Sequence, residues 1–107
     1  MNKYEELSKI FKTLCEPIRL QILDILSCDE MCACKILEGL LISQSTLSHH
    51  MKVLINSGLV TSRKDATWIY YSINRENIEK LHVSIEELTS QKDNCICQKT
   101  DNNCKKA

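Results

Sequence analysis

The chain has 107 residues, 43% of them apolar and 26% charged, and its formal net charge is zero. This length suits one domain with a single core, and the ordinary balance of apolar and charged residues excludes a chain that is disordered throughout. The sequence holds no apolar run long enough to cross a bilayer and does not begin like a signal peptide, so we expect a cytoplasmic protein without a membrane partner.

The seven cysteines and the uneven distribution of charge bear on function. The odd number of cysteines and the lack of a signal peptide argue against a disulfide framework, so clustered thiols indicate metal binding or redox sensing. Residues 41–75 contain four Lys or Arg residues against one Asp, whereas residues 76–91 contain four Glu residues against one Lys. A dimer carries the basic region twice, so a net charge of zero does not exclude binding to nucleic acid.

The first half of the chain predicts four helices. Apolar residues recur at helical spacing over residues 4–14. Pro17 suits the first turn of a second helix, and the almost continuous apolar residues after it predict a deeply buried element. A short third helix is expected over residues 32–40. Ser43 is a good N-cap for a fourth helix, which ends at Gly58.

The following segment predicts a small β-hairpin. Its two β-type stretches, residues 59–64 and 67–73, flank Asp65-Ala66. The turn lacks the glycine that tight hairpin turns prefer, so we expect a loop that is either longer or strained.

A last helix is expected over residues 75–91, and the polar residues 92–107 form a separate tail. The first and last helices each carry a narrow apolar face that one small domain does not cover. Pairing these faces in a homodimer buries both. We therefore expect one domain over residues 1–91 with dimerising first and last helices, followed by a cysteine-containing tail.

The fourth helix presents a polar face. Leu47, Met51 and Leu54 form its inner stripe, so the remaining side chains point outward. Helix, short turn, polar-faced helix and hairpin is the order of a winged helix-turn-helix, a mainly α fold that places its second helix in the major groove. The residues expected to contact double-stranded operator DNA are Gln44, Ser45 and Ser48 at base edges, Thr46 and Lys52 at the backbone, His49 on the same face, and Arg63 and Lys64 in the wing.

Several segments together carry a family resemblance. Residues 14–23, 31–34, 43–54 and 57–60 resemble the ArsR/SmtB family, and the likeness covers about residues 5–90. The resemblance implies a dimeric winged-helix repressor that leaves operator DNA when it binds a metal or metalloid. Glu30-Met31-Cys32-Ala33-Cys34 is similar to the Glu-Leu-Cys-x-Cys sequence of the arsenic-responsive branch.

Cys32 and Cys34 are the expected sensor ligands. Paired thiolates suit soft acceptors such as arsenite, antimonite, cadmium or lead. On a regular helix two residues at this spacing point roughly 200° apart, so we expect ligand binding to unwind the first turn of the third helix. A helix N-terminus also lowers the pKa of a thiol and raises its reactivity.

The remaining sulfur ligands are left open by the sequence. Leu37 stands where the arsenic branch sometimes has a third cysteine, and no cysteine precedes Cys15, unlike in the cadmium/lead branch. Cys95 and Cys97 in the tail are secondary candidates. The roles of Cys15, Cys28 and Cys104 are not decided, although Cys15 is expected to serve packing between helices. The family's last-helix site is matched only by His82, which disfavours zinc or nickel sensing there.

The sequence thus predicts a repressor that is released by trivalent arsenic, as arsenite or a methylarsenite, or by antimonite. The alternatives are a repressor of the same fold that senses cadmium or lead, or one that senses thiol redox state. An enzyme is not expected, because the chain lacks a Cys-x-x-Cys motif in a strand-to-helix context, a glycine-rich phosphate loop and a paired acid/base constellation.

Overall fold

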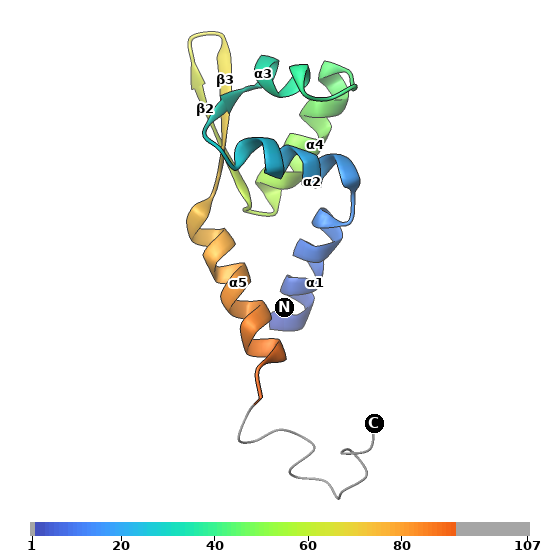
Figure 1. The fold of residues 1–107 in the computed structure, drawn as a ribbon, viewed down its shortest axis with the longest axis vertical. Coiled ribbons are helices and arrows are strands. Elements are labelled where there is room, and N and C mark those ends of the chain that lie inside the picture. Colours follow the sequence, from blue (N-terminus) through green and yellow to red (C-terminus); the bar gives the residue numbers. More distant parts are fainter. Residues whose placement is uncertain (1, 92–107) are drawn as a thin grey trace, which may run out of the picture.

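The computed structural model describes residues 2–91, so the tail, with Cys95, Cys97 and Cys104, lies outside the described residues. In chain order the elements are α1 (Lys3–Leu14), α2 (Pro17–Leu26), β1 (Met31–Cys32), α3 (Ala33–Glu38), α4 (Gln44–Asn56), β2 (Val60–Asp65), β3 (Trp68–Ile73) and α5 (Arg75–Thr89). The helices α2, α3 and α4 and the sheet form one body, from which α1 and α5 extend on the side opposite the β2–β3 hairpin (Figure 1). This arrangement is the predicted mainly α fold with a small hairpin.

Side chains at the helix starts explain why several boundaries were predictable. Pro17 occupies the first turn of α2, after Glu16 as N-cap. The Ser43 hydroxyl accepts a hydrogen bond of 3.1 Å from the Thr46 N–H at the start of α4. Each cap satisfies an N–H group that the first helical turn leaves without a partner.

The core lies between α2, α3, α4 and the inner face of the sheet. The predicted inner stripe of α4 is confirmed, since Leu47, Met51 and Leu54 are each at most 1% exposed. The expectation of a deeply buried α2 holds only in part. Ile22 and Leu26 are buried, but Leu20 is 51% exposed because it lies on the opposite side of the helix.

The predicted hairpin is confirmed, and its turn is tight rather than long. Asp65 pairs with Trp68, which leaves only two residues between the strands. Ala66 has a φ of 55°, in the left-handed region that glycine adopts more easily. The sequence predicted a loop that is either longer or strained, and the structure contains the strained loop.

A third strand, β1, was not predicted. Met31 pairs with Tyr71 and Cys32 with Tyr70, so the antiparallel sheet has the order β1-β3-β2. The expectation that the third helix includes Cys32 is wrong. Pairing with β3 holds Cys32 extended, with φ −75° and ψ 157°, and α3 begins one residue later.

The helices α1 and α5 leave apolar side chains in solvent. Within this single chain α1 buries no side chain and α5 buries only Leu81. A groove of about 370 Å³ is lined by residues from both helices, among them Tyr4, Phe11 and Leu88. These three side chains are 60%, 42% and 45% exposed, as the predicted apolar faces require.

Candidate thiol site and nucleic-acid interface

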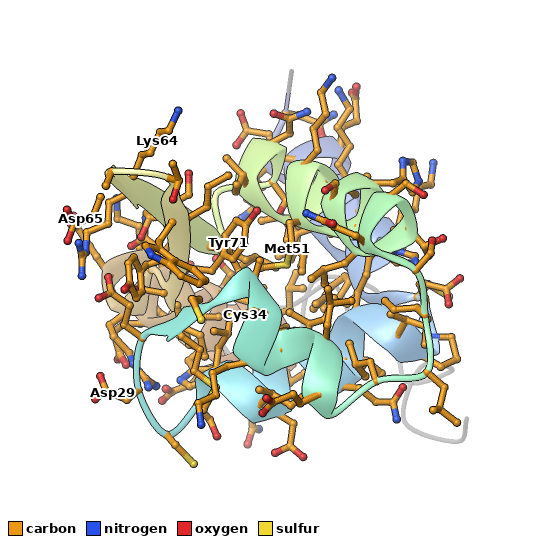
Figure 2. The ribbon with its side chains drawn as sticks, turned by 90° about the horizontal axis from the view of Figure 1, so that it is seen from above. Asp29, Cys34, Met51, Lys64, Asp65 and Tyr71 are labelled. Atoms are coloured by element: carbon orange, nitrogen blue, oxygen red, sulfur yellow. The ribbon has the colours of Figure 1, made fainter. Side chains whose placement is uncertain are left out.

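The thiols of Cys32 and Cys34 converge where the chain passes from β1 into α3. Their Sγ atoms are 2.6 Å apart, and Cys34 lies beside the sheet at the start of α3 (Figure 2). The expected divergence of roughly 200° applies only when both residues are helical, and Cys32 is extended. A shared ligand therefore does not require the helix to unwind.

The two thiols are electrostatically different. The hydrogen bond from Cys34, followed by the backbone N–H of Lys35, lowers the pKa of Cys32. The same hydrogen bond raises the pKa of Cys34, and burial and the neighbouring Cys32 charge act in the same direction. The lowered pKa makes Cys32 the more acidic thiol of the pair.

The two sulfurs lie closer together than they would on a shared ion. Two sulfurs on one tetrahedral zinc lie about 3.8 Å apart, given Zn–S bonds of ~2.3 Å, so a shared ion of this kind requires the sulfurs of Cys32 and Cys34, now 2.6 Å apart, to separate. Across residues 2–91, His, Cys, Asp and Glu side chains do not gather in any group of three or more that could hold a metal. Within the described part of the chain, the two sulfurs of Cys32 and Cys34 are therefore brought together without a third candidate ligand.

The other described cysteines stand apart from this pair. Cys15 and Cys28 are both exposed. Cys15 lines the groove between α1 and α5, so the packing role expected for it between helices is not what the single chain shows. His82 is exposed on α5, with its Nδ1 atom 3.8 Å from the Glu79 carboxylate.

The outer face of α4 carries the predicted DNA-reading side chains. Gln44, Ser45, Thr46, Ser48, His49 and Lys52 are all exposed. Ser43 orders the start of this face, because its hydroxyl lies 3.1 Å from the Ser45 hydroxyl and 2.9 Å from the Thr46 hydroxyl. The N-terminal turn of α4 is thus preorganised and polar.

His50 fixes α4 to α2 from the inner side. It is 9% exposed, and its Nδ1 accepts a hydrogen bond of 3.1 Å from the Arg19 Nε–H. Burial first, and then the charge of Arg19, lower the pKa of His50 below its ordinary value. The sequence did not reveal this contact, although position 50 lies three residues after Leu47 on the inner side of the helix.

The two cations of the wing, Lys64 and Arg63, lie in different surroundings. Lys64 is exposed on β2 and points away from the body (Figure 2). Arg63 donates hydrogen bonds of 2.9 and 2.6 Å to the two carboxylate oxygens of Glu30. Its guanidinium also lies 4.4 Å from the centre of the Tyr70 ring. Glu30, identified in the sequence only as part of a motif, is therefore a partner of a predicted DNA-contacting residue.

A polar-faced helix held on a second helix and followed by an antiparallel wing defines a winged helix-turn-helix transcriptional regulator. The family described as bacterial regulatory protein, arsR family, matches residues 16–62. None of the helices within residues 2–91 is long and apolar enough to span a membrane.

The comparisons with individual proteins agree with this class. The chain is 44% identical to the arsenical resistance operon repressor of Staphylococcus xylosus over 95 residues, covering 89% of this chain and 91% of that protein. It is 43% identical to the repressor of the same description from Staphylococcus aureus, with the same coverage. The crystal structure of NolR from Sinorhizobium fredii matches with a TM-score of 0.66 and 32% identity, over 81% of this chain and 87% of that one. The chain belongs to the ArsR/SmtB family.

Proposed function

We propose that this protein is a homodimeric repressor that is released from operator DNA when trivalent arsenic binds Cys32 and Cys34. The observation that carries the proposal is the convergence of two unequal thiols, 2.6 Å apart, at the junction of the sheet and α3. Through the sheet and α3 this junction connects to both the wing and α4. The protein acts in the cytoplasm as a regulator and not as an enzyme.

The exposed start of α4 supplies the reading surface for DNA. Amide and hydroxyl groups at Gln44, Ser45 and Ser48 exchange hydrogen bonds with base edges, while Lys52 neutralises phosphate. Thr46 and His49 extend the same surface, and Lys64 contacts the backbone from the wing. Arg63 joins this surface to the extent that its ion pair with Glu30 leaves guanidinium N–H groups free.

In the dimer this reading surface is present twice, once on each subunit. The apolar faces of α1 and α5 are exposed in the single chain, and pairing two copies along them buries both faces. A twofold dimer presents two reading helices to an inverted-repeat operator.

The chemistry of the pair suits a trivalent arsenical. The Cys32 thiolate attacks arsenic and displaces one hydroxide, and Cys34 displaces a second hydroxide as it forms the other arsenic–sulfur bond. Arsenous acid and two thiols thus give two waters and an arsenic bound to two sulfurs and one remaining hydroxyl. Antimonite reacts in the same way, and a methylarsenical needs only these two sulfurs. The tail thiols Cys95 and Cys97 are the proposed source of further ligands, and cadmium or lead is the alternative inducer when they complete a four-sulfur site.

The test uses the reduced full-length protein and an operator duplex selected from random DNA by that protein. Arsenite is expected to weaken operator binding of the parent, measured by fluorescence anisotropy. A variant with both Cys32→Ser and Cys34→Ser is expected to bind the duplex normally and to ignore arsenite. Cys28→Ser removes an exposed thiol close in sequence and is the matched control, which is expected to respond like the parent. Arsenite release of the double-serine variant would contradict the proposed site.

Redox sensing is a second candidate that the short sulfur–sulfur distance favours. Cys32 and Cys34 lose two electrons and two protons to form a disulfide, while a peroxide is reduced to water or alcohol. Hydrogen peroxide added to the reduced complex without arsenite separates the two functions. Release by peroxide, reversed by dithiothreitol, together with no response to arsenite, identifies a redox sensor.

A further inference from the structure

Glu30 and Arg63 join the thiol site to the wing across the sheet. Cys32 pairs with Tyr70, and Tyr70 pairs with Arg63, so these three residues occupy one cross-strand row. Residues directly opposite one another in antiparallel strands point to the same face. Glu30 lies two residues before Cys32, and its carboxylate reaches Arg63 on β2 beyond the intervening strand β3.

The geometry of this bridge is specific. Both carboxylate oxygens accept hydrogen bonds from the Arg63 fork, and the Ser72 hydroxyl donates a third bond of 3.2 Å. The Tyr70 ring lies against the guanidinium at 4.4 Å. Two hydrogen bonds and a ring contact fix the orientation of the Arg63 guanidinium as well as its distance from the Glu30 carboxylate. An exposed ion pair of this kind adds little to global stability.

The remaining connection between β1 and the wing is slight. The strands β2 and β3 share six residue pairs and form a firm hairpin, whereas β1 joins β3 through only two pairs. The hairpin also packs on α2, α3 and α4, and the Glu30–Arg63 bridge is the side-chain link that joins it to the segment just before the thiol pair.

We propose that Glu30 is a positioning residue that, through its bridge to Arg63, transmits ligand binding at Cys32 and Cys34 to the wing. This inference rests on the proposed function. A ligand that separates the two sulfurs displaces Cys32, and with it Glu30 two residues earlier. The fork tolerates little displacement, so the wing moves with Glu30 and changes its position relative to α4. By linkage, DNA that fixes the wing weakens inducer binding by the same factor.

The quantity to measure is the ratio of operator Kd with arsenite to operator Kd without it, for the reduced full-length protein. Glu30→Gln keeps the shape of the side chain but removes the charge that holds the fork. Its arsenite stoichiometry, followed by thiolate–arsenic ultraviolet absorption, is expected to equal that of the parent. The ratio of the two operator Kd values is expected to fall roughly three- to tenfold in this variant, within the range by which residues between two coupled sites alter coupling.

Two further variants test whether the effect comes from the Glu30–Arg63 bridge itself rather than from a lost charge or a misfolded protein. Glu76→Gln removes the same charge and breaks an ion pair with Lys80 on α5, and it is expected to keep the parent ratio. The double variant Glu30→Arg with Arg63→Glu rebuilds the pair in reverse and is expected to recover part of the ratio lost in Glu30→Gln.

The outcomes distinguish the two proposals. A parent that arsenite does not release overturns the proposed function and this inference with it. A parent that is released, with Glu30→Gln released just as strongly, overturns the inference alone. An equal fall of the Kd ratio in Glu30→Gln and Glu76→Gln also overturns it, because the loss of one negative charge anywhere on the protein then accounts for the effect.

Discussion

Replacing Gly58 by alanine tests how α4 is joined to the wing. Gly58 ends α4 with a φ of +84°. Its N–H bonds the Ile55 carbonyl at 2.9 Å, and the next N–H, of Leu59, bonds the Leu54 carbonyl at 3.2 Å. These two bonds form a Schellman motif, in which this position takes the left-handed conformation. The Gly58→Ala change therefore strains the backbone at the junction between α4 and β2.

Two costs and one gain determine the expected magnitude. The left-handed conformation costs alanine about 1–2 kcal/mol. A Cβ atom at Gly58 also meets the Asn77 Nδ2 at 3.0 Å, and that amide is held by its hydrogen bond of 2.8 Å to the Gly58 carbonyl. Loss of that bond costs about 1 kcal/mol, while the reduced freedom of the unfolded chain returns about 0.4–1 kcal/mol. We expect a net destabilisation of about 2 kcal/mol.

The assay is urea unfolding at one fixed protein concentration, because dimerisation makes apparent stability depend on concentration. Gly39→Ala is the matched control, since Gly39 has an ordinary φ of −91°. An added Cβ there meets the flexible end of Ile25 at 3.2 Å and the Ile36 carbonyl oxygen at an ordinary 3.6 Å. That variant is expected to stay within about 0.5 kcal/mol of the parent. In an Asn77→Ala background the Gly58→Ala change should cost about 1 kcal/mol less, because the obstructing amide is gone. Equal effects of the two glycine replacements would refute the reasoning.

The remaining predictions concern the buried histidine and the apolar faces. The lowered pKa of His50 means that the folded protein binds a proton there less readily than the unfolded chain, in which histidine takes up a proton near pH ~6.5. Stability in thermal unfolding is therefore expected to fall as the pH drops from about 7.5 to 5.5, and to fall less in His50→Gln. An equal pH dependence in parent and variant would assign the effect to other groups. Phe11→Glu places a charge in the apolar groove of α1 and is expected to weaken the dimer at least about tenfold in sedimentation equilibrium, while Gln21→Glu, which adds the same charge on α2, leaves it unchanged. A Phe11→Glu protein that dimerises like the parent would place the interface elsewhere.

The sequence by itself determined the features that depend on neighbouring residues. Pro17 and Ser43 start their helices through local geometry and capping, and Gly58 ends α4 through its own backbone freedom. The spacing of Leu47, Met51 and Leu54 was enough to orient α4, because helical periodicity alone decides which side chains share a face. The fold class and the exposed polar face of α4 follow from these local rules.

The tertiary structure decided how the thiol pair is built and what it contacts. Cys32 is extended because β1 pairs with β3, nearly 40 residues further along the chain, and this pairing brings its sulfur to Cys34. The Arg19–His50 and Glu30–Arg63 contacts join residues 31 and 33 positions apart. No local propensity encodes such contacts, because they depend on how the elements pack. Residue types therefore led to a prediction of the chemistry of the site, whereas the geometry of the thiol pair and the Glu30–Arg63 contact came only from the folded chain.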